Sequence, residues 1–169
     1  MSEIGQTEDK RARHRGLALL ISLVIAFGVS GIGAAVTRPS ISTWYAQLNK
    51  PAFAPPNWVF APAWTILYAM MALAVWLVWL CRDKDLARAR VAFCFYGVQL
   101  ALNLLWSVLF FGWHDIALAG LDILLLLAAI AVTIFAFRRL SPVAGWLLIP
   151  YVAWVSYAAA LNLGFWYLN

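Results

Sequence analysis

Histidine and cysteine are scarce in this sequence, with two of each, so metal and disulfide chemistry have few candidate residues. His14 lies in a basic segment and His114 in a predicted turn, and no zinc-ligand spacing, nucleophile triad, paired carboxylates or glycine-rich phosphate loop occurs. We therefore expect no metal, no required cofactor and no firm catalytic residue. Cys81 and Cys94 are predicted to be small apolar fillers near the inner ends of two membrane spans.

Charged residues are also few, at 11% of the chain, whereas hydrophobic residues reach 65%. Soluble domains average about 25% charged and about half apolar residues, so lipid is the expected solvent for this excess. Five apolar stretches each reach the roughly 20 residues needed to cross about 30 Å of hydrocarbon. They cover residues 16–37, 58–81, 91–112, 116–137 and 142–167. Because these runs do not alternate, the predicted fold is an all-α integral membrane bundle of five transmembrane helices, in one domain over residues 16–169.

The twelve basic residues are unevenly distributed along the chain. All but Arg38 and Lys50 precede the first span or follow the second and fourth spans, and these segments share one side of the membrane. The positive-inside rule then predicts the N-terminus inside and the C-terminus outside, and we expect the bacterial cell membrane. The net charge of +5 is explained by topology and indicates no nucleic-acid partner. Residues 1–15 are predicted to be a charged, disordered cytoplasmic tail.

Residues 38–57 form the only long connection between predicted spans, and they lie on the outer side. Proline fixes φ and lowers the entropy of the unfolded chain, so this loop is predicted to be stiff. The stretch "SISTWYAQL" within it is expected to form a short helix capped by Ser40 or Ser42. The loop is interpreted as a lid, whose principal residues are Lys50, Pro51, Pro55 and Pro56.

Polar and aromatic residues within the spans gather in the outer half of the predicted bundle. On each helix they recur three or four residues apart, and so share one face. They are Trp64 and Tyr68; Gln99, Asn103 and Trp106; Asp122; and Tyr151, Trp154 and Ala158. Their shared depth beneath the loop predicts a ligand pocket.

Two alternatives remain open for the polar members of this set. Hydrogen bonds to neighbouring helices explain Gln99 and Asn103 at least as well as ligand contact does. An intramembrane acid such as Asp122 is costly, so it is protonated, paired near the interface or functional.

Three segments of the sequence resemble one known family. They are "WYAQLNKPAFAPPNWVFAPAWTILY", "QLALNLLWSVLFF" and "PYVAWVSYAAALN". They are similar to segments of the tryptophan-rich sensory protein and translocator protein family (TspO/MBR, the peripheral-type benzodiazepine receptor group), and the likeness covers nearly all of residues 40–167. The resemblance implies five transmembrane helices, a homodimer, and binding of porphyrins such as protoporphyrin IX or haem.

The same resemblance assigns pocket roles to individual residues of this chain. The matched positions are Tyr45, Trp64, Tyr68, Asn103, Trp106, Trp154 and Ala158. A ligand with propionates is expected to pair with Lys50 or Arg38 at the pocket mouth. The family's proposed sterol motif is incomplete here, because no basic residue follows Tyr167.

The leading expectation is a membrane receptor or sensor for porphyrins and related flat hydrophobic ligands, linked to tetrapyrrole homeostasis or stress signalling. Its partners are then a hydrophobic small molecule, membrane lipid and a second copy of the chain. One alternative is a light- or oxygen-dependent porphyrin-degrading enzyme, with Trp64 and Trp154 as redox participants. Another is a transporter of porphyrins or sterol-like lipids, which the lack of an internal repeat disfavours.

Overall fold

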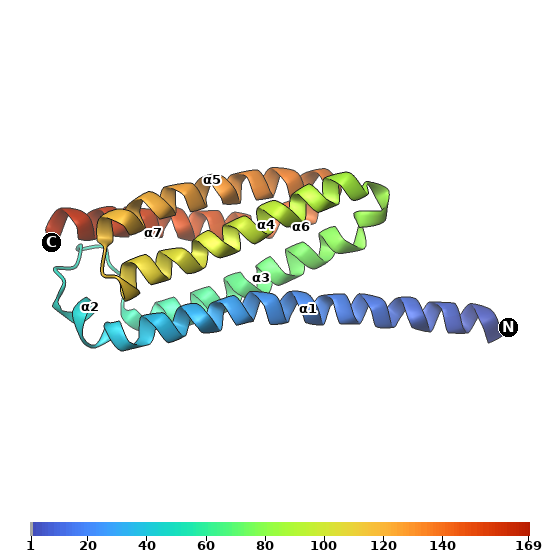
Figure 1. The fold of residues 1–169 in the computed structure, drawn as a ribbon, viewed down its shortest axis with the longest axis horizontal. Helices are drawn as coiled ribbons and strands as arrows, with labels where there is room; N and C mark the ends of the chain where they lie inside the picture. The colour runs from blue at the N-terminus through green and yellow to red at the C-terminus, as the bar shows by residue number, and fades with distance from the viewer. Residues whose placement is uncertain (1) are drawn as a thin grey trace.

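The computed structural model describes the backbone of residues 2–169 and the side chains from residue 12 onward. It is a bundle of five long helices (Figure 1), and no strand occurs within residues 2–169. The long helices are α1 (Ser2–Ile41), α3 (Phe60–Leu80), α4 (Leu86–Ser107), α5 (Ile116–Leu140) and α7 (Ile149–Leu168). Shorter elements are α2 (Trp44–Gln47), the 3₁₀ turns η1 (Asn57–Val59) and η2 (Arg82–Lys84), the π-helix η3 (Val108–Gly112) and α6 (Pro142–Trp146).

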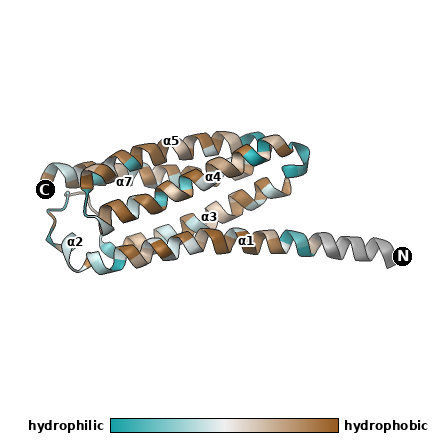
Figure 2. Cartoon of the chain, in the orientation of Figure 1, coloured by the Kyte–Doolittle hydropathy of each residue, from teal (hydrophilic) through white to brown (hydrophobic). Residues whose placement is uncertain are grey.

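Five helical segments of the described chain are long and apolar enough to cross a membrane. They are Ala12–Ile41, Asn57–Lys84, Leu86–Gly112, Ile116–Leu140 and Pro142–Leu168. Figure 2 shows hydrophobic residues along the middle of the helices and hydrophilic ones mainly near their ends. Large apolar side chains also point outward, as with Leu121 and Leu125 of α5, which suits contact with lipid. The prediction of an all-α, five-span integral membrane protein is confirmed.

The first helix is longer at both ends than the sequence predicts. It begins at Ser2, so the expected disorder over residues 1–15 differs from the structure, and Met1 lies outside the described residues. Extending a helix that already exists adds a hydrogen bond for each residue without a new nucleation step, and Lys, Arg and Ala are good helix formers. The helix also continues to Ile41 and includes Pro39, which shortens the loop that was expected to start at residue 38.

The capping residues predicted for the loop helix are wrong. The residue preceding α2 is Thr43, and it makes no side-chain capping bond. Ser40 lies in the last turn of α1, is buried, and donates a hydrogen bond to the carbonyl oxygen of Phe111 over 2.6 Å. Its hydroxyl therefore ties α1 to the π-helix η3 instead of capping α2.

Polar N-caps mark the starts of three other helices. Asp85 accepts a hydrogen bond from the backbone nitrogen of Arg88 at the start of α4, and Asp115 accepts one from Leu118 at the start of α5. Ser141 accepts one from the backbone nitrogen of Ala144 over 3.4 Å at the start of α6, where the missing N–H of Pro142 costs no hydrogen bond. These short, capped connections hold consecutive helices antiparallel, with α4 packed on α5 and α5 on α7.

Two hydrophobic clusters divide the interior. The larger one lies along the middle of α3, α4, α5 and α7 and includes Met71, Ile130 and Tyr151, all fully buried. The smaller one, which includes Tyr45, Phe110 and Phe165, lies where α2, the loop and the C-terminus meet (Figure 1). We call this end of the bundle the loop end, and the opposite end, which carries Arg82, the basic end.

Candidate ligand-binding site

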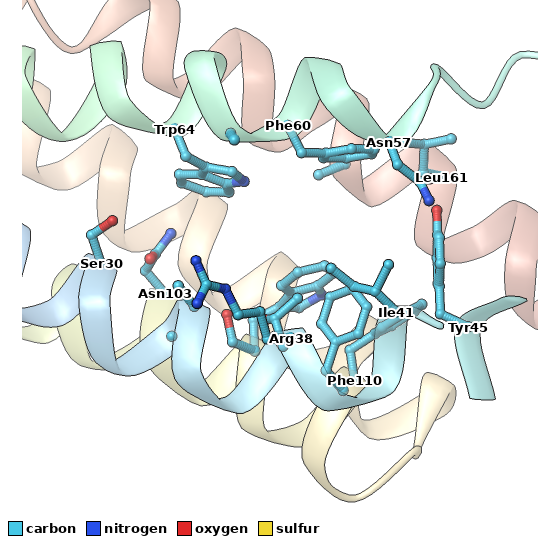
Figure 3. A pocket seen from close by; sticks show the side chains of 18 of the residues that line it. Ser30, Arg38, Ile41, Tyr45, Asn57, Phe60, Trp64, Asn103, Phe110 and Leu161 are labelled. Carbon is cyan, nitrogen blue, oxygen red and sulfur yellow. The ribbon is translucent and has the colours of Figure 1, made fainter. Parts of the chain in front are cut away.

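A cavity of about 390 Å³ lies between the helices at the loop end (Figure 3). Its walls come from α1, α3, the α4–η3 segment and α7, and Tyr45 of α2 closes one end. Seven of the predicted site residues line it: Tyr45, Trp64, Tyr68, Asn103, Trp106, Trp154 and Ala158. The structure thus brings together residues that are more than 100 positions apart in the sequence.

Three predicted site residues lie behind the cavity wall and do not line it. Gln99 is buried, with its amide nitrogen 3.9 Å from the sulfur of Met71. Tyr151 is fully buried and accepts a hydrogen bond from Asn103. Asp122 is buried on α5, and neither carboxylate oxygen has a hydrogen-bond partner among the described residues. Each of these helices is oriented so that the side chain points between neighbouring helices and not into the cavity.

Asn103 forms the polar floor of the cavity. Its side-chain oxygen accepts a hydrogen bond from the hydroxyl of Tyr68, and its nitrogen donates to the hydroxyl of Tyr151 over 3.2 Å. The indole of Trp64 packs beside both tyrosines, at ring-centroid distances of 5.7 Å and 6.3 Å. Asn103 thus hydrogen-bonds residues of two neighbouring helices, as one of the two sequence alternatives predicts, and it also lines the cavity. An amide nitrogen carries two hydrogens, of which Tyr151 accepts one.

Trp106 forms a side wall and is held in place by a second amide. Its ring stacks on that of Phe110, with a centroid distance of 5.1 Å and an interplanar angle of 20°. Its indole nitrogen donates a hydrogen bond to the side-chain oxygen of Asn162 over 3.2 Å. Asn162 in turn donates to the carbonyl of Ile116 over 2.9 Å. This chain of hydrogen bonds fixes the orientation of the indole between α4, α5 and α7.

The π-helix η3 brings Phe110 and Phe111 together at the cavity. The wider turn of a π-helix changes the direction of the side chains that follow it, and such turns are frequent at functional sites. His114 lies two residues beyond this π-helix and has a φ of 59°, in the left-handed region; its imidazole stacks on the indole of Trp44 at a ring-centroid distance of 4.4 Å. No feature of the sequence predicted that the end of this span would form a π-helix.

Tyr45 closes the loop end of the cavity. Its ring packs against Phe111 and Phe165, and the ammonium group of Lys50 lies 4.6 Å from the ring centroid. Burial, with a smaller contribution from Tyr157, raises the pKa of Tyr45, so its phenol is uncharged at neutral pH and is available as a hydrogen-bond donor. None of the predicted lid residues lines the cavity, which Tyr45 closes at this end; they are Lys50, Pro51, Pro55 and Pro56.

The loop is fastened to α7 at three points. Asn49 and Asn169 bond reciprocally, with the backbone nitrogen of Asn49 donating to the Asn169 side chain over 2.8 Å and the Asn169 amide donating back over 3.1 Å. The hydroxyl of Tyr157 donates to the carbonyl of Phe53 over 2.8 Å. Pro51 is buried against Gly164, where a methyl group would approach its ring to 2.6 Å. The loop is therefore a fastened roof over this end of the bundle.

Sequence reasoning missed the wall that α1 provides. Ser30, Gly33, Ala34, Thr37, Arg38 and Ile41 all line the cavity. Small residues on α1 serve two purposes, and one of them is packing, since Ala26 is fully buried against the core. Further along the helix they instead leave space. The sequence does show small and polar residues recurring every three or four positions from Ser30 to Arg38, which places them on one face of the helix.

The fold and the cavity define a class: a multi-pass integral membrane protein with a cavity lined by aromatic residues at one end of a five-helix bundle. The chain belongs to the TspO/MBR family, whose model matches residues 20–168. It is 40% identical over 154 residues to the tryptophan-rich protein TspO of Archaeoglobus fulgidus, covering 90% of this chain and 97% of that one. It is 38% identical over 152 residues to the tryptophan-rich sensory protein of Cereibacter sphaeroides, covering 90% and 92%. It is also 42% identical over 126 residues to the translocator protein of Ovis aries, covering 75% of each chain.

Proposed function

We propose that this protein is a membrane receptor or sensor that binds a porphyrin, such as protoporphyrin IX or haem, in the cavity at the loop end. The observation that carries this proposal is the composition of the cavity walls: Trp64, Trp106 and Trp154 come from three different helices and line one cavity. Flat aromatic ligands stack favourably on such rings. Readout of tetrapyrrole levels, for homeostasis or stress signalling, is the biological role this binding would serve.

Each part of the cavity has a role in the proposed complex. The indoles and Phe60, which meets Trp154 edge-on at 5.9 Å, supply apolar and stacking contacts. Asn103 and the uncharged phenol of Tyr45 orient polar groups of the ligand. Ala158 keeps space open between the aromatic rings. The chain's own residues supply no acid–base pair at this site, which is why binding, with no porphyrin breakdown, is the function proposed.

Titration of protoporphyrin IX into the purified protein tests this proposal, with the porphyrin absorbance band as readout. We expect Trp154→Ala and Trp64→Ala each to raise Kd at least tenfold, equivalent to about 1.4 kcal/mol. Trp146→Ala is the matched control, because Trp146 is exposed at the basic end, far along the bundle from the cavity. Equal affinity in all four proteins would show that porphyrin does not bind in this cavity.

The proposal includes a location and an assembly. The charge distribution supports an orientation with the N-terminus inside and the C-terminus outside, and the bacterial cell membrane is the location proposed with it. A homodimer is supported by the low burial of α1, whose most apolar window is 6% buried, whereas the other four spans are 28–39% buried. Covalent crosslinking in native membranes tests the dimer, and a purely monomeric product at saturating crosslinker would contradict it.

A further inference from the structure

The cavity opens sideways, between two helices. Exposed residues that also line a cavity mark its opening, and here they lie on α1, and on the turn η1 and the first turns of α3 that continue from it. Figure 3 shows these two helices on opposite sides of the cavity, with Arg38 and Ile41 on one and Asn57 and Trp64 on the other. The exposed lining residues are Ala34, Arg38 and Ile41 of α1, Asn57 of η1, and Ala61 and Thr65 of α3. Both segments belong to membrane spans, so this opening faces lipid.

The fastened roof leaves the side opening as the available route into the cavity. Three separate contacts tie residues 49–53 to α7, and the buried ring of Tyr45 lies beneath Lys50. Opening the roof would break all of these contacts. The side opening is bordered by small side chains at Ala34, Ala61 and Thr65 and requires no such change.

Arg38 places a positive charge at this opening. It lies in the last turn of α1 and lines the cavity, and its guanidinium has no ion pair or hydrogen bond among the described residues. The other basic residue of the loop end, Lys50, lies over the outer face of Tyr45 and does not line the cavity. Asp115, an acidic residue at the loop end, accepts a hydrogen bond from the backbone nitrogen of Leu118 and so caps α5. Arg38 is therefore the cation that an entering ligand would meet.

We propose that Arg38 is the specificity-determining residue of the cavity, and that it binds a carboxylate of an amphiphile whose flat apolar body enters sideways between α1 and α3. A guanidinium holds a carboxylate through two parallel hydrogen bonds, which gives direction as well as energy. A position near the end of a span lets the long side chain keep its charge at the interface while the apolar body remains in the membrane. This proposal rests on the proposed function for the identity of the apolar body.

Two ligands with the same porphyrin ring, one with free carboxylates and one without, test the role of Arg38. Protoporphyrin IX carries two carboxylates, and its dimethyl ester carries the same ring without them. In phosphatidylcholine nanodiscs, we expect the wild-type protein to bind the acid at least tenfold more tightly than the ester. Arg38→Gln should weaken binding of the acid about tenfold and leave the ester unchanged, and Arg38→Lys should recover part of the difference. Arg90→Gln, an exposed arginine at the basic end, is the control and should behave as wild type.

The possible outcomes separate this inference from the proposed function. If both porphyrins bind the wild-type protein equally, or Arg38→Gln weakens both to the same extent, the role of Arg38 is refuted while porphyrin binding stands. If Lys50→Gln removes the preference for the acid and Arg38→Gln does not, the assignment to Arg38 is wrong. If neither porphyrin binds, the proposed function fails, and this inference fails with it.

Association kinetics test the sideways route. Ala61→Phe narrows the opening from α3, and we expect it to slow protoporphyrin IX association about tenfold in stopped-flow measurements. Ala101→Phe adds the same side chain to an exposed position on α4 that does not line the cavity, and should leave the rate unchanged. Equal association rates in both variants would overturn entry between α1 and α3.

Discussion

Asn103 is the residue on which the floor of the cavity depends, because it satisfies two buried tyrosine hydroxyls. Asn103→Leu would leave the hydroxyls of Tyr68 and Tyr151 without partners inside the bundle. An unsatisfied buried polar group costs about 1–3 kcal/mol, so we expect this variant to lower the free energy of unfolding by at least about 2 kcal/mol in detergent.

A triple variant provides the control for that measurement. Combining Asn103→Leu with Tyr68→Phe and Tyr151→Phe removes both orphaned hydroxyls, and should recover most of the lost stability. Thermal unfolding followed by circular dichroism measures both proteins. If the triple variant were less stable than Asn103→Leu alone, the loss would come from packing and the hydrogen-bond account would be wrong.

Ala158 permits a test of the cavity that leaves its polar groups in place. Ala158→Phe would fill space next to Trp154, and we expect it to raise the Kd for protoporphyrin IX at least tenfold while the helical circular dichroism spectrum stays unchanged. Ala160→Phe is the matched control, since Ala160 is exposed on the same helix. Wild-type affinity in Ala158→Phe would place the ligand elsewhere.

Sequence pattern identified the three tryptophans of the cavity but none of its four phenylalanines, and it did not separate the polar residues that line the cavity from those that do not. Trp64 and Trp154 follow from depth and spacing, which depend only on span boundaries and the helical period. Gln99 and Asp122 satisfied the same criteria, yet they lie behind the wall. The rotation of each helix decides which of two adjacent polar residues faces the cavity, and that rotation is set by packing against other helices. Asp122 remains without a partner among the residues described, and the structure offers no account of it.

At the scale of the elements, the contact between α7 and the roof is the most specific. Gly164 lies under Pro51, where an added methyl group would come within 2.6 Å of the proline ring, and the ring has no flexible end to move away. We expect Gly164→Ala to displace the roof and to speed chymotrypsin cleavage after the exposed Phe53 several-fold. Gly97→Ala is the control, because nothing lies within 4 Å of its added methyl group. Equal cleavage rates would show that the roof is not fastened at Pro51.

The elements themselves were predictable wherever hydrophobicity alone determines them. All five spans lie where long apolar runs predict helices, and Pro142 begins the last one as expected. The π-turn at Val108–Gly112 was not predictable, because it depends on how α4 meets α1 and α5. The end of α1 also lay beyond prediction: a proline usually stops a helix, but at Pro39 only the last turn remained to be formed.

At the scale of the whole molecule, α1 stands apart from the other helices. Near the basic end it is held to α3 by a hydrogen bond from the indole of Trp76 to the carbonyl of Arg15, over 3.0 Å. Toward the loop end it separates from α3 to form the cavity opening, and Ser40 joins it to η3. A helix fastened at both ends, with an opening along one side, lets the cavity communicate with lipid without unfolding the bundle.

The orientation of the molecule in the membrane decides which leaflet this opening faces. Ten of the twelve basic residues lie on the side of the basic end, so the positive-inside rule predicts that the loop end is outside. Single cysteines in a background with Cys81 and Cys94 replaced by alanine report this directly. We expect Ser42→Cys to react with a membrane-impermeant maleimide in intact cells, and Asp83→Cys to react only after permeabilisation. The opposite pattern would place Arg38 and the cavity opening in the inner leaflet, where an amphiphile made inside the cell would reach them first.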